Sequence, residues 1–378
     1  MAAPTIQGVG ITDFGKFPEL TEEALAQRAL LDALTDAGIE MAEVQAFYCG
    51  NVFGPMLPGQ RALRPLGALG GAVYNVNNAC SSGATAFNLA LQALLSGQYE
   101  TVVVFGMDHL SARGGGPLSL SNDDWNNRRG MIMPALYAMR AQRYLHDHAL
   151  STNALADVSV KNRRHGLLNP IAKFCKAATR EEVLASRMIS EPLTLLQCCP
   201  AVVDGAAALV LSTRSSKGRA PAIRVRASVV QSGLFETGPV DMTEAEITAR
   251  TARIAYEQAA IGPEDLNVLE VHDAFTISEL LYYEALGLCN RGEAADLLAS
   301  GATTLAGRTP VNPSGGLLAK GHPPGATGVA QIVEICEQLQ GRAGKRQVHH
   351  ARVGLTQVTG GGISGVDHAA CSIHILSR

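Results

Sequence analysis

Apolar and polar positions along the chain alternate between the patterns of strands and of helices. Residues 73–79 form a short run with β-branched side chains, typical of a strand. Over 84–95 the apolar residues recur at helical spacing: Phe87, Leu91, Leu94 and Leu95. A continuous apolar run follows at 101–105 and predicts a buried strand. This alternation indicates an α/β fold.

A second copy of this pattern occurs near the C-terminus. The tripeptide Gly-Ala-Thr stands at 83–85 and again at 325–327, and each copy begins a predicted helix that leads into an apolar strand. Another pair of related segments, at 204–208 and 367–371, also leads into strands. We therefore predict a duplicated α/β unit.

The first unit contains an insertion. It is longer than the second unit by about 80 residues, which is too many for a structureless loop. We expect these residues to form a subdomain at about 112–195, beginning at the glycine-rich stretch 114–117 and containing helices near 134–148 and 180–189. A cluster of Ser, Arg, Gly and Pro at 212–221 then predicts the boundary between the two halves.

That boundary divides the chain into an N-terminal half, 1–215, and a C-terminal half, 216–378. The second half is expected to begin with a strand and to continue with helices at about 243–260 and 276–287.

The inserted subdomain is the most basic stretch of the chain. Its basic residues are Arg128, Arg129, Arg140, Arg143, Lys161, Arg163, Arg164, Lys173 and Lys176. One interpretation is a solvated helical face. The other is a lid that binds a phosphate-bearing substrate, and the sequence does not decide between them.

Composition narrows the class of protein. With 378 residues, 47% apolar residues and 39 glycines, the chain fits a large glycine-rich α/β enzyme. The net charge of −3 gives no reason to expect nucleic acid or an anionic membrane as a partner. No apolar run is long enough to cross a membrane, and the first residues lack a signal-peptide pattern.

The eight cysteines have no CxxC pair and no spacing typical of a zinc site, so we expect no bound metal. They imply no disulfide framework, which predicts a cytoplasmic protein. The adjacent Cys198 and Cys199 are interpreted as buried thiols.

Cys80 is the first candidate for chemistry. It stands in the stretch Asn-Ala-Cys-Ser-Ser-Gly at 78–83, between a predicted strand and a predicted helix. A helix N-terminus favours a thiolate, and its backbone N–H groups can stabilise a developing oxyanion. The alternative is a buried cysteine that packs as a small hydrophobic residue.

Other candidates lie at turns of the second half. His272 follows a predicted strand and is either a satisfied core histidine or a donor that points into a site. Asp273 is expected to cap the helix that follows it. His322 stands in a glycine- and proline-rich turn before a helix and is the expected base for Cys80, whereas Lys320 is expected to face solvent. Gly360 is the first of three glycines that follow a predicted strand. The backbone N–H groups of this glycine run could line an anion pocket, or the run is a plain tight turn.

Together these stretches resemble the thiolases, and most closely the sterol-carrier-protein-2 type with its bacterial and archaeal relatives. The resemblance rests on the turn at 78–83, on His-Asp-Ala-Phe at 272–275, on Gly-His-Pro at 321–323 and on the glycine run at 360–362. It extends over almost the whole chain. It implies two similar α/β halves packed in five layers (αβαβα), with a loop domain inserted in the first.

The resemblance also implies an activity. Thiolases transfer acyl groups between coenzyme A esters through a cysteine thioester, as homodimers or larger oligomers and without a permanently bound cofactor. Carried over, Cys80 would be the nucleophile, His322 its base, and His272 with His322 would face the second substrate. The N–H groups of Cys80 and Gly360 would hold the oxyanion. Coenzyme A would contact the loop domain.

The chain departs from the family pattern at the second cysteine, which usually moves a proton on or off the α-carbon. The corresponding positions hold Val358 and Ala274, and neither side chain transfers protons. A histidine or a water would have to do this, or the reaction differs from ordinary thiolysis.

Three functions therefore remain open. The first is a thiolase acting on a 3-ketoacyl-CoA. The second is a specialised acyltransferase for aromatic or branched acyl groups, which in that branch often works with a small zinc-ribbon, OB-fold partner. The third is a non-catalytic lipid-binding protein, which would have no need of all three residues Cys80, His272 and His322.

Overall fold

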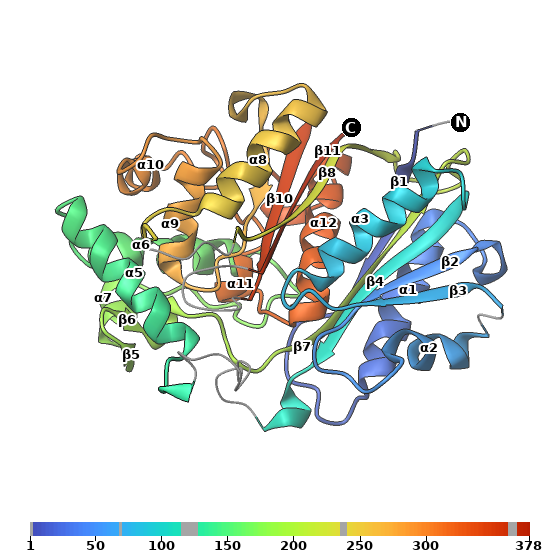
Figure 1. Cartoon of the computed structure of the whole chain (residues 1–378), viewed down its shortest axis with the longest axis horizontal. Helices are drawn as coiled ribbons and strands as arrows, with labels where there is room; N and C mark the ends of the chain where they lie inside the picture. The colour runs from blue at the N-terminus through green and yellow to red at the C-terminus, as the bar shows by residue number, and fades with distance from the viewer. Residues whose placement is uncertain (1–2, 68–69, 115–127, 235–239, 362–368) are drawn as a thin grey trace.

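One mixed sheet of nine strands runs through both halves of the chain (Figure 1). The computed structural model describes residues 3–67, 70–114, 128–234, 240–361 and 369–378. The strands of this sheet are β1 (Thr5–Ile11), β2 (Ala46–Gly50), β3 (Ala72–Val76), β4 (Thr101–His109), β7 (Asp204–Ser212), β8 (Ile223–Ser232), β9 (Val268–Glu270), β10 (Val353–Gly360) and β11 (Ala370–Ser377).

The order of these strands confirms the duplication. It reads β3-β2-β4-β7-β1-β8-β11-β10-β9, so that β2, β4, β7 and β1 are mirrored by β9, β10, β11 and β8. The two halves join where β1 pairs with β8 through Thr5–Arg224 and Ile6–Ile223. Leu269 of β9 forms a parallel bridge with Val311, so the segment at Val311 lies beside β9 as β3 lies beside β2. The related segment at 367–371 lies partly outside the described residues.

Helices complete the five layers. The helices α3 (Ser82–Leu95) and α12 (Pro324–Gln340) pack against each other and against strands of both halves, so they form the central layer. One outer face is covered by α1 (Glu22–Ala37), and the other by α8 (Glu246–Ala259), against which α9 (Thr276–Ala285) packs. The predicted thiolase-type fold is confirmed.

Shorter helices lie between these elements: α2 (Pro58–Leu63), α10 (Ala294–Ala299) and α11 (Gly316–Ala319). None of the helices in the described ranges is both long and apolar enough to cross a membrane.

The segment between β4 and β7 packs on the second half. It contains α5 (Met133–Asp147), α6 (Asn153–Gly166), α7 (Arg180–Ala185) and the short strands β5 (Met188–Ser190) and β6 (Leu193–Thr194). The helix predicted to reach residue 189 ends earlier, because the backbone becomes extended at Ser186 and leads into β5. Residues 115–117, expected to open the subdomain, lie outside the described residues. The division at 215 and 216 stays a prediction.

Several basic side chains of this segment are buried and hold it to the second half. Arg140 donates to the backbone oxygens of Met242 and Glu244 at 2.7 and 2.9 Å. Lys161 is ion-paired with Glu279 and donates to the backbone oxygen of Val311 at 3.0 Å. These contacts are structural, so the basic composition of the segment is only partly a surface property.

The two central helices approach each other through glycines at their N-terminal ends. A Cβ added at Gly83 would lie 2.6 Å from the backbone oxygen of Gly325, and one at Gly106 would lie 2.1 Å from the same atom. A Cβ at Gly328 would lie 2.6 Å from the backbone nitrogen of Ala84. Any side chain at these positions would therefore force α3, α12 and β4 apart.

We expect Gly106→Ala to lower the free energy of unfolding by about 1–3 kcal/mol, as overpacking of a dense core does. Thermal unfolding followed by circular dichroism measures the change. Gly71→Ala is the matched control, because its Cβ would meet no atom closer than 3.3 Å. Equal melting temperatures for the two variants would contradict the close approach.

Candidate active site

Cys80 lies in a tight turn between β3 and α3. Ala79 has a φ of 49°, in the left-handed region, and turns the chain sharply before the helix begins at Ser82. The Ser82 hydroxyl holds this turn, since it accepts the Asn78 N–H at 2.9 Å and donates to the backbone oxygen of Ala79 at 2.6 Å. The turn presents the thiol beyond the end of the helix.

The second half contacts this turn directly. A Cβ added at Gly360, the last residue of β10, would lie 2.1 Å from the backbone oxygen of Asn78. The hydroxyls of Ser81 and Ser372, which lies on β11, are 2.7 Å apart. Gly360 is therefore needed for close packing of the two halves around Cys80.

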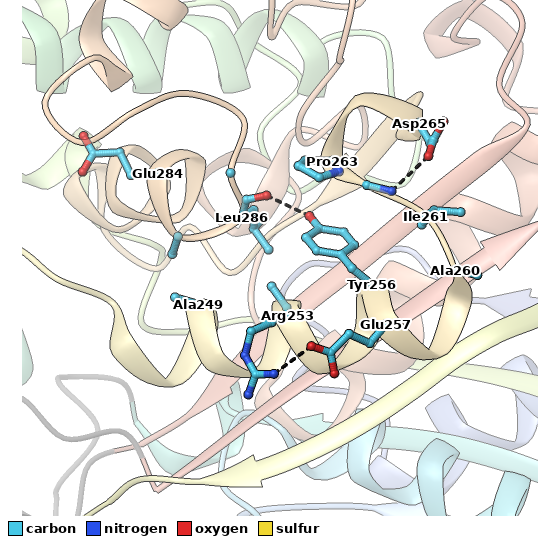
Figure 2. Close-up of a pocket in the computed structure, with 14 residues that line it drawn as sticks. Ala249, Arg253, Tyr256, Glu257, Ala260, Ile261, Pro263, Asp265, Glu284 and Leu286 are labelled. Carbon is cyan, nitrogen blue, oxygen red and sulfur yellow. Dashed lines mark hydrogen bonds and ion pairs between the residues drawn. The ribbon is translucent and has the colours of Figure 1, made fainter.

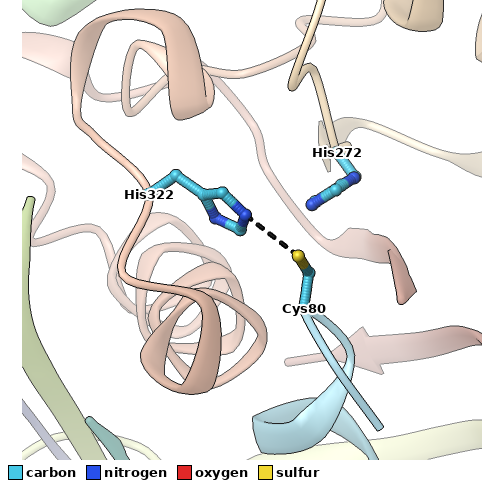
Figure 3. Close-up of side chains that lie close together, drawn as sticks. All are labelled: Cys80, His272 and His322. Atoms are coloured by element: carbon cyan, nitrogen blue, oxygen red, sulfur yellow. Dashed lines mark hydrogen bonds between the residues drawn. The ribbon is translucent and has the colours of Figure 1, made fainter. Parts of the chain in front are cut away.

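His322 lies opposite Cys80, just before α12. Its Nε2 is 3.2 Å from the Cys80 sulfur (Figure 3). Its Nδ1 is 2.7 Å from the hydroxyl of Thr327, which itself donates to the backbone oxygen of Pro323 at 2.9 Å. Because the only proton of the Thr327 hydroxyl is donated to Pro323, this hydroxyl can only accept a hydrogen bond from Nδ1–H of His322. His322 is thereby held as the tautomer whose Nε2 lone pair faces the thiol.

His272 completes the group. Its Nδ1 is 3.2 Å from the Thr359 hydroxyl, which is 3.1 Å from the hydroxyl of Tyr282. Its Nε2 is buried and has no hydrogen-bond partner. One ligand-type atom from each of Cys80, His272 and His322 lies within 4.8 Å of the others, and both rings point toward the sulfur (Figure 3).

The surroundings favour the uncharged forms of Cys80, His272 and His322. Burial, with a contribution from the Asp108 carboxylate, raises the pKa of Cys80 to about 12, although the N–H groups of Gly361 and of Cys80 itself act in the opposite direction. Burial lowers the pKa of His272 to about 3 and that of His322 well below its usual range. The helix N-terminus was expected to favour a thiolate, and the cost of burying the charge acts against that effect.

Two further predictions are corrected. Asp273 does not cap α9; it accepts the N–H groups of Leu317 and Leu318, at 2.7 and 3.3 Å, at the start of α11. Lys320 does not face solvent, since it is 1% exposed and its Nζ is 3.5 Å from Glu270. Both side chains support the loop that leads to His322.

Sequence reasoning did not assign a role in the site to Thr327 or Thr359, and it named Gly361 only as part of the glycine run. Thr327 lies four residues after Pro323, a spacing that lets a threonine hydroxyl reach the backbone oxygen one turn earlier. Thr359 has no comparable signal. Gly362, the last residue of the predicted glycine run, lies outside the described residues.

A separate pocket of about 680 Å³ lies between α8 and the end of α9 (Figure 2). Tyr256 crosses it and donates to the backbone oxygen of Leu286 at 2.8 Å, and Arg253 pairs with Glu257 at its rim. The pocket contains none of the three site residues.

Comparison with known proteins gives a consistent result. The family model for the thiolase N-terminal domain matches residues 6–215, and that for the thiolase C-terminal domain-like family matches residues 237–377. The chain is 41% identical to the benzoylsuccinyl-CoA thiolase subunit BbsB of Thauera aromatica, over 97% of each chain. It is 36% identical to sterol carrier protein 2 of Homo sapiens, over 93% of this chain and 68% of the human protein.

A solved structure, the Ltp2-ChsH2(DUF35) aldolase, superposes with a TM-score of 0.85 and 26% identity over 100% of this chain and 98% of that one. The expected resemblance is thus confirmed along the full length. The chain belongs to the thiolase family, and it is a coenzyme-A-dependent acyltransferase.

Proposed function

We propose that this enzyme forms an acyl thioester on Cys80 and exchanges it with coenzyme A, in thiolysis of a 3-ketoacyl-CoA or in the reverse condensation. One observation carries the proposal: the lone pair of His322 Nε2 faces the Cys80 thiol at 3.2 Å, with the unpartnered Nε2 of His272 beside both.

In the first step His322 takes the thiol proton while the sulfur attacks the keto carbon. Because burial disfavours the charged form of both groups, the proton is proposed to move during the attack rather than before it. The oxyanion is held by N–H groups of the turn. We place Gly361 in this role beside Cys80, instead of the predicted Gly360, because the Gly361 N–H faces the sulfur.

Cleavage of the carbon–carbon bond then leaves the acyl group on Cys80 and an enolate of the departing thioester. Ala274 and Val358 cannot protonate that enolate. We propose that His322 does so with the proton it took from Cys80, which balances the step. Burial lowers the pKa of His322, so its imidazolium is a stronger acid than an ordinary one and favours this return of the proton.

His272 is proposed to stabilise the enolate oxygen through Nε2–H. Gln357 supports this tautomer: its Oε1 accepts the His272 backbone N–H at 3.0 Å, so its amide nitrogen is the end that donates to the Tyr282 hydroxyl oxygen. Tyr282 then donates to Thr359, and Thr359 donates to His272 Nδ1. This order leaves the proton on Nε2.

A second candidate is a specialised reaction on an aromatic or branched acyl group with a partner protein. Two comparisons favour it: the relative from Thauera aromatica is named as a subunit of a benzoylsuccinyl-CoA thiolase, and the solved neighbour is a complex with a DUF35 protein. A small zinc-ribbon, OB-fold protein remains the expected partner.

We also propose a homodimer. The strand β3 lies at the edge of the sheet, directly before the Cys80 turn, and Tyr74 on it is 39% exposed. An unpaired edge of this kind accepts a second strand.

We place the coenzyme A nucleotide beside the inserted segment, where Arg164 and Lys176 are exposed. The cytoplasmic location stays a prediction, consistent with eight free thiols.

Replacing Cys80 by alanine should abolish acylation, because no other described side chain occupies the position opposite His322. Incubation with a panel of 3-ketoacyl-CoAs followed by intact-protein mass spectrometry detects the adduct. Cys175→Ala, at an exposed thiol, should keep it. A wild-type protein that never gains an acyl mass with any substrate or partner would support a lipid-binding role instead.

The acylation rate should be nearly constant from about pH 6.5 to about pH 9, because His322 is already neutral and Cys80 is not yet ionised over this range. It should fall only at lower pH, as His322 becomes protonated and can no longer accept the thiol proton. Single-turnover kinetics measure the profile. A decline on the alkaline side near pH 8 would instead reveal a thiolate–imidazolium pair.

Thr327→Val should lower the rate on this plateau about tenfold or more without moving the pH profile, and Thr327→Ser should restore the rate.

If the second candidate holds, purification from the native host should yield a complex rather than a homodimer alone, with a mass measured by light scattering. Thiolysis of aromatic 3-ketoacyl-CoAs should then rise about tenfold or more when the partner is added. Equal activity on straight-chain substrates without any partner would favour the simple thiolase.

A further inference from the structure

The three side chains of the active site also form the ligand set of a borderline-soft divalent cation. Thiolate and imidazole are the preferred ligands of Zn²⁺, and sites with three protein ligands keep a fourth position open. We propose that Zn²⁺, or a cation of the same class, binds reversibly to Cys80 Sγ, His272 Nε2 and His322 Nε2 and thereby inhibits the enzyme.

The distances fit this coordination. With Zn–S of about 2.3 Å and Zn–N of about 2.0 Å, tetrahedral ligand atoms lie about 3.3–3.6 Å apart. In the structure the His322 Nε2 to Cys80 Sγ distance is 3.2 Å, and all three ligand atoms lie within 4.8 Å of one another. Two imidazoles bound through Nε2 would have ring centroids about 5.2 Å apart. The centroids of His272 and His322 are 5.1 Å apart.

The surroundings of the rings fit as well. Metal-bound histidines nearly always donate their other N–H to a fixed acceptor, and here Thr327 and Thr359 lie at 2.7 and 3.2 Å from the two Nδ1 atoms. His322 already has the required tautomer. His272 must move its proton to Nδ1, which the Thr359 and Tyr282 hydroxyls permit by reversing their donor direction.

An independent observation supports a ligand at this point. His272 is 5% exposed, and its Nε2 is buried without a partner, so this atom is directed into the space beside the sulfur. The nearby Asp108 carboxylate is fully buried, and its negative charge favours a cation there.

The binding step balances without any redox change. A bond forms between the metal and the Cys80 sulfur, the S–H bond breaks, and one proton is released to the buffer, because His322 Nε2 is itself a ligand. Inhibition follows because the sulfur and His322 lone pairs are then both occupied. Binding rests on the geometry alone, whereas the inhibition rests on the proposed function.

Co²⁺ titration of the untagged, chelator-treated protein tests the binding. We expect one equivalent of Co²⁺ to give a thiolate-to-cobalt charge-transfer band, which added Zn²⁺ removes. Cys80→Ser should lose the band, and His272→Asn should weaken Co²⁺ binding about tenfold or more. Because His349 and His350 are exposed neighbours, the double variant His349→Ala, His350→Ala is the control for surface binding and should keep the band.

Acyl-adduct formation is measured on the same samples. Zn²⁺ should reduce it at least about tenfold, a chelator should restore it, and an enzyme already acylated on Cys80 should show no cobalt band. A protein that forms the adduct but gives no band, or a band that persists in Cys80→Ser, would overturn the metal site. A band in a protein that never forms an adduct would leave the metal site intact and refute the proposed function.

Discussion

The close contact between the N-terminal ends of α3 and α12 determines where the chemistry of this protein lies. Cys80 and His322 each precede one of these helices by a few residues, one in each half of the duplicated fold. Glycines at 83, 106 and 325 remove the side chains that would separate the helices and β4. The thiol and the imidazole therefore meet because two equivalent elements of a repeated unit are packed against each other.

Burial then sets the chemical state of the site. Burial around Cys80, His272 and His322 disfavours their charged forms, so the protein controls these groups mainly through where their protons lie. Two threonines, one on α12 and one on β10, contact the Nδ1 atoms. Through these contacts the protein can give two identical side chains opposite tasks, one accepting a proton and the other donating a hydrogen bond.

Much of this could be predicted from the sequence, because the repeated Gly-Ala-Thr and the turns around Cys80, His272 and His322 are local signals. The roles of Asp273 and Lys320 could not, since each depends on a partner that only the folded chain brings near: the start of α11 for Asp273 and Glu270 for Lys320. The upward shift of the Cys80 pKa could not be predicted for a similar reason. A helix N-terminus can be recognised in a sequence, but the depth of burial around it cannot.

The inserted segment belongs to the first half in sequence but is anchored in the second. Lys161 on α6 pairs with Glu279 on α9 and contacts Val311, more than 100 residues later. During synthesis, α6 leaves the ribosome long before these partners exist. Burying the charged ammonium group of Lys161 is unfavourable until Glu279 and Val311 are available as partners. This segment must therefore remain exposed to solvent until most of the chain has been made. The inserted segment, in the middle of the chain, is thus among the last parts to fold, and it can fold only after the last third of the polypeptide has been synthesised.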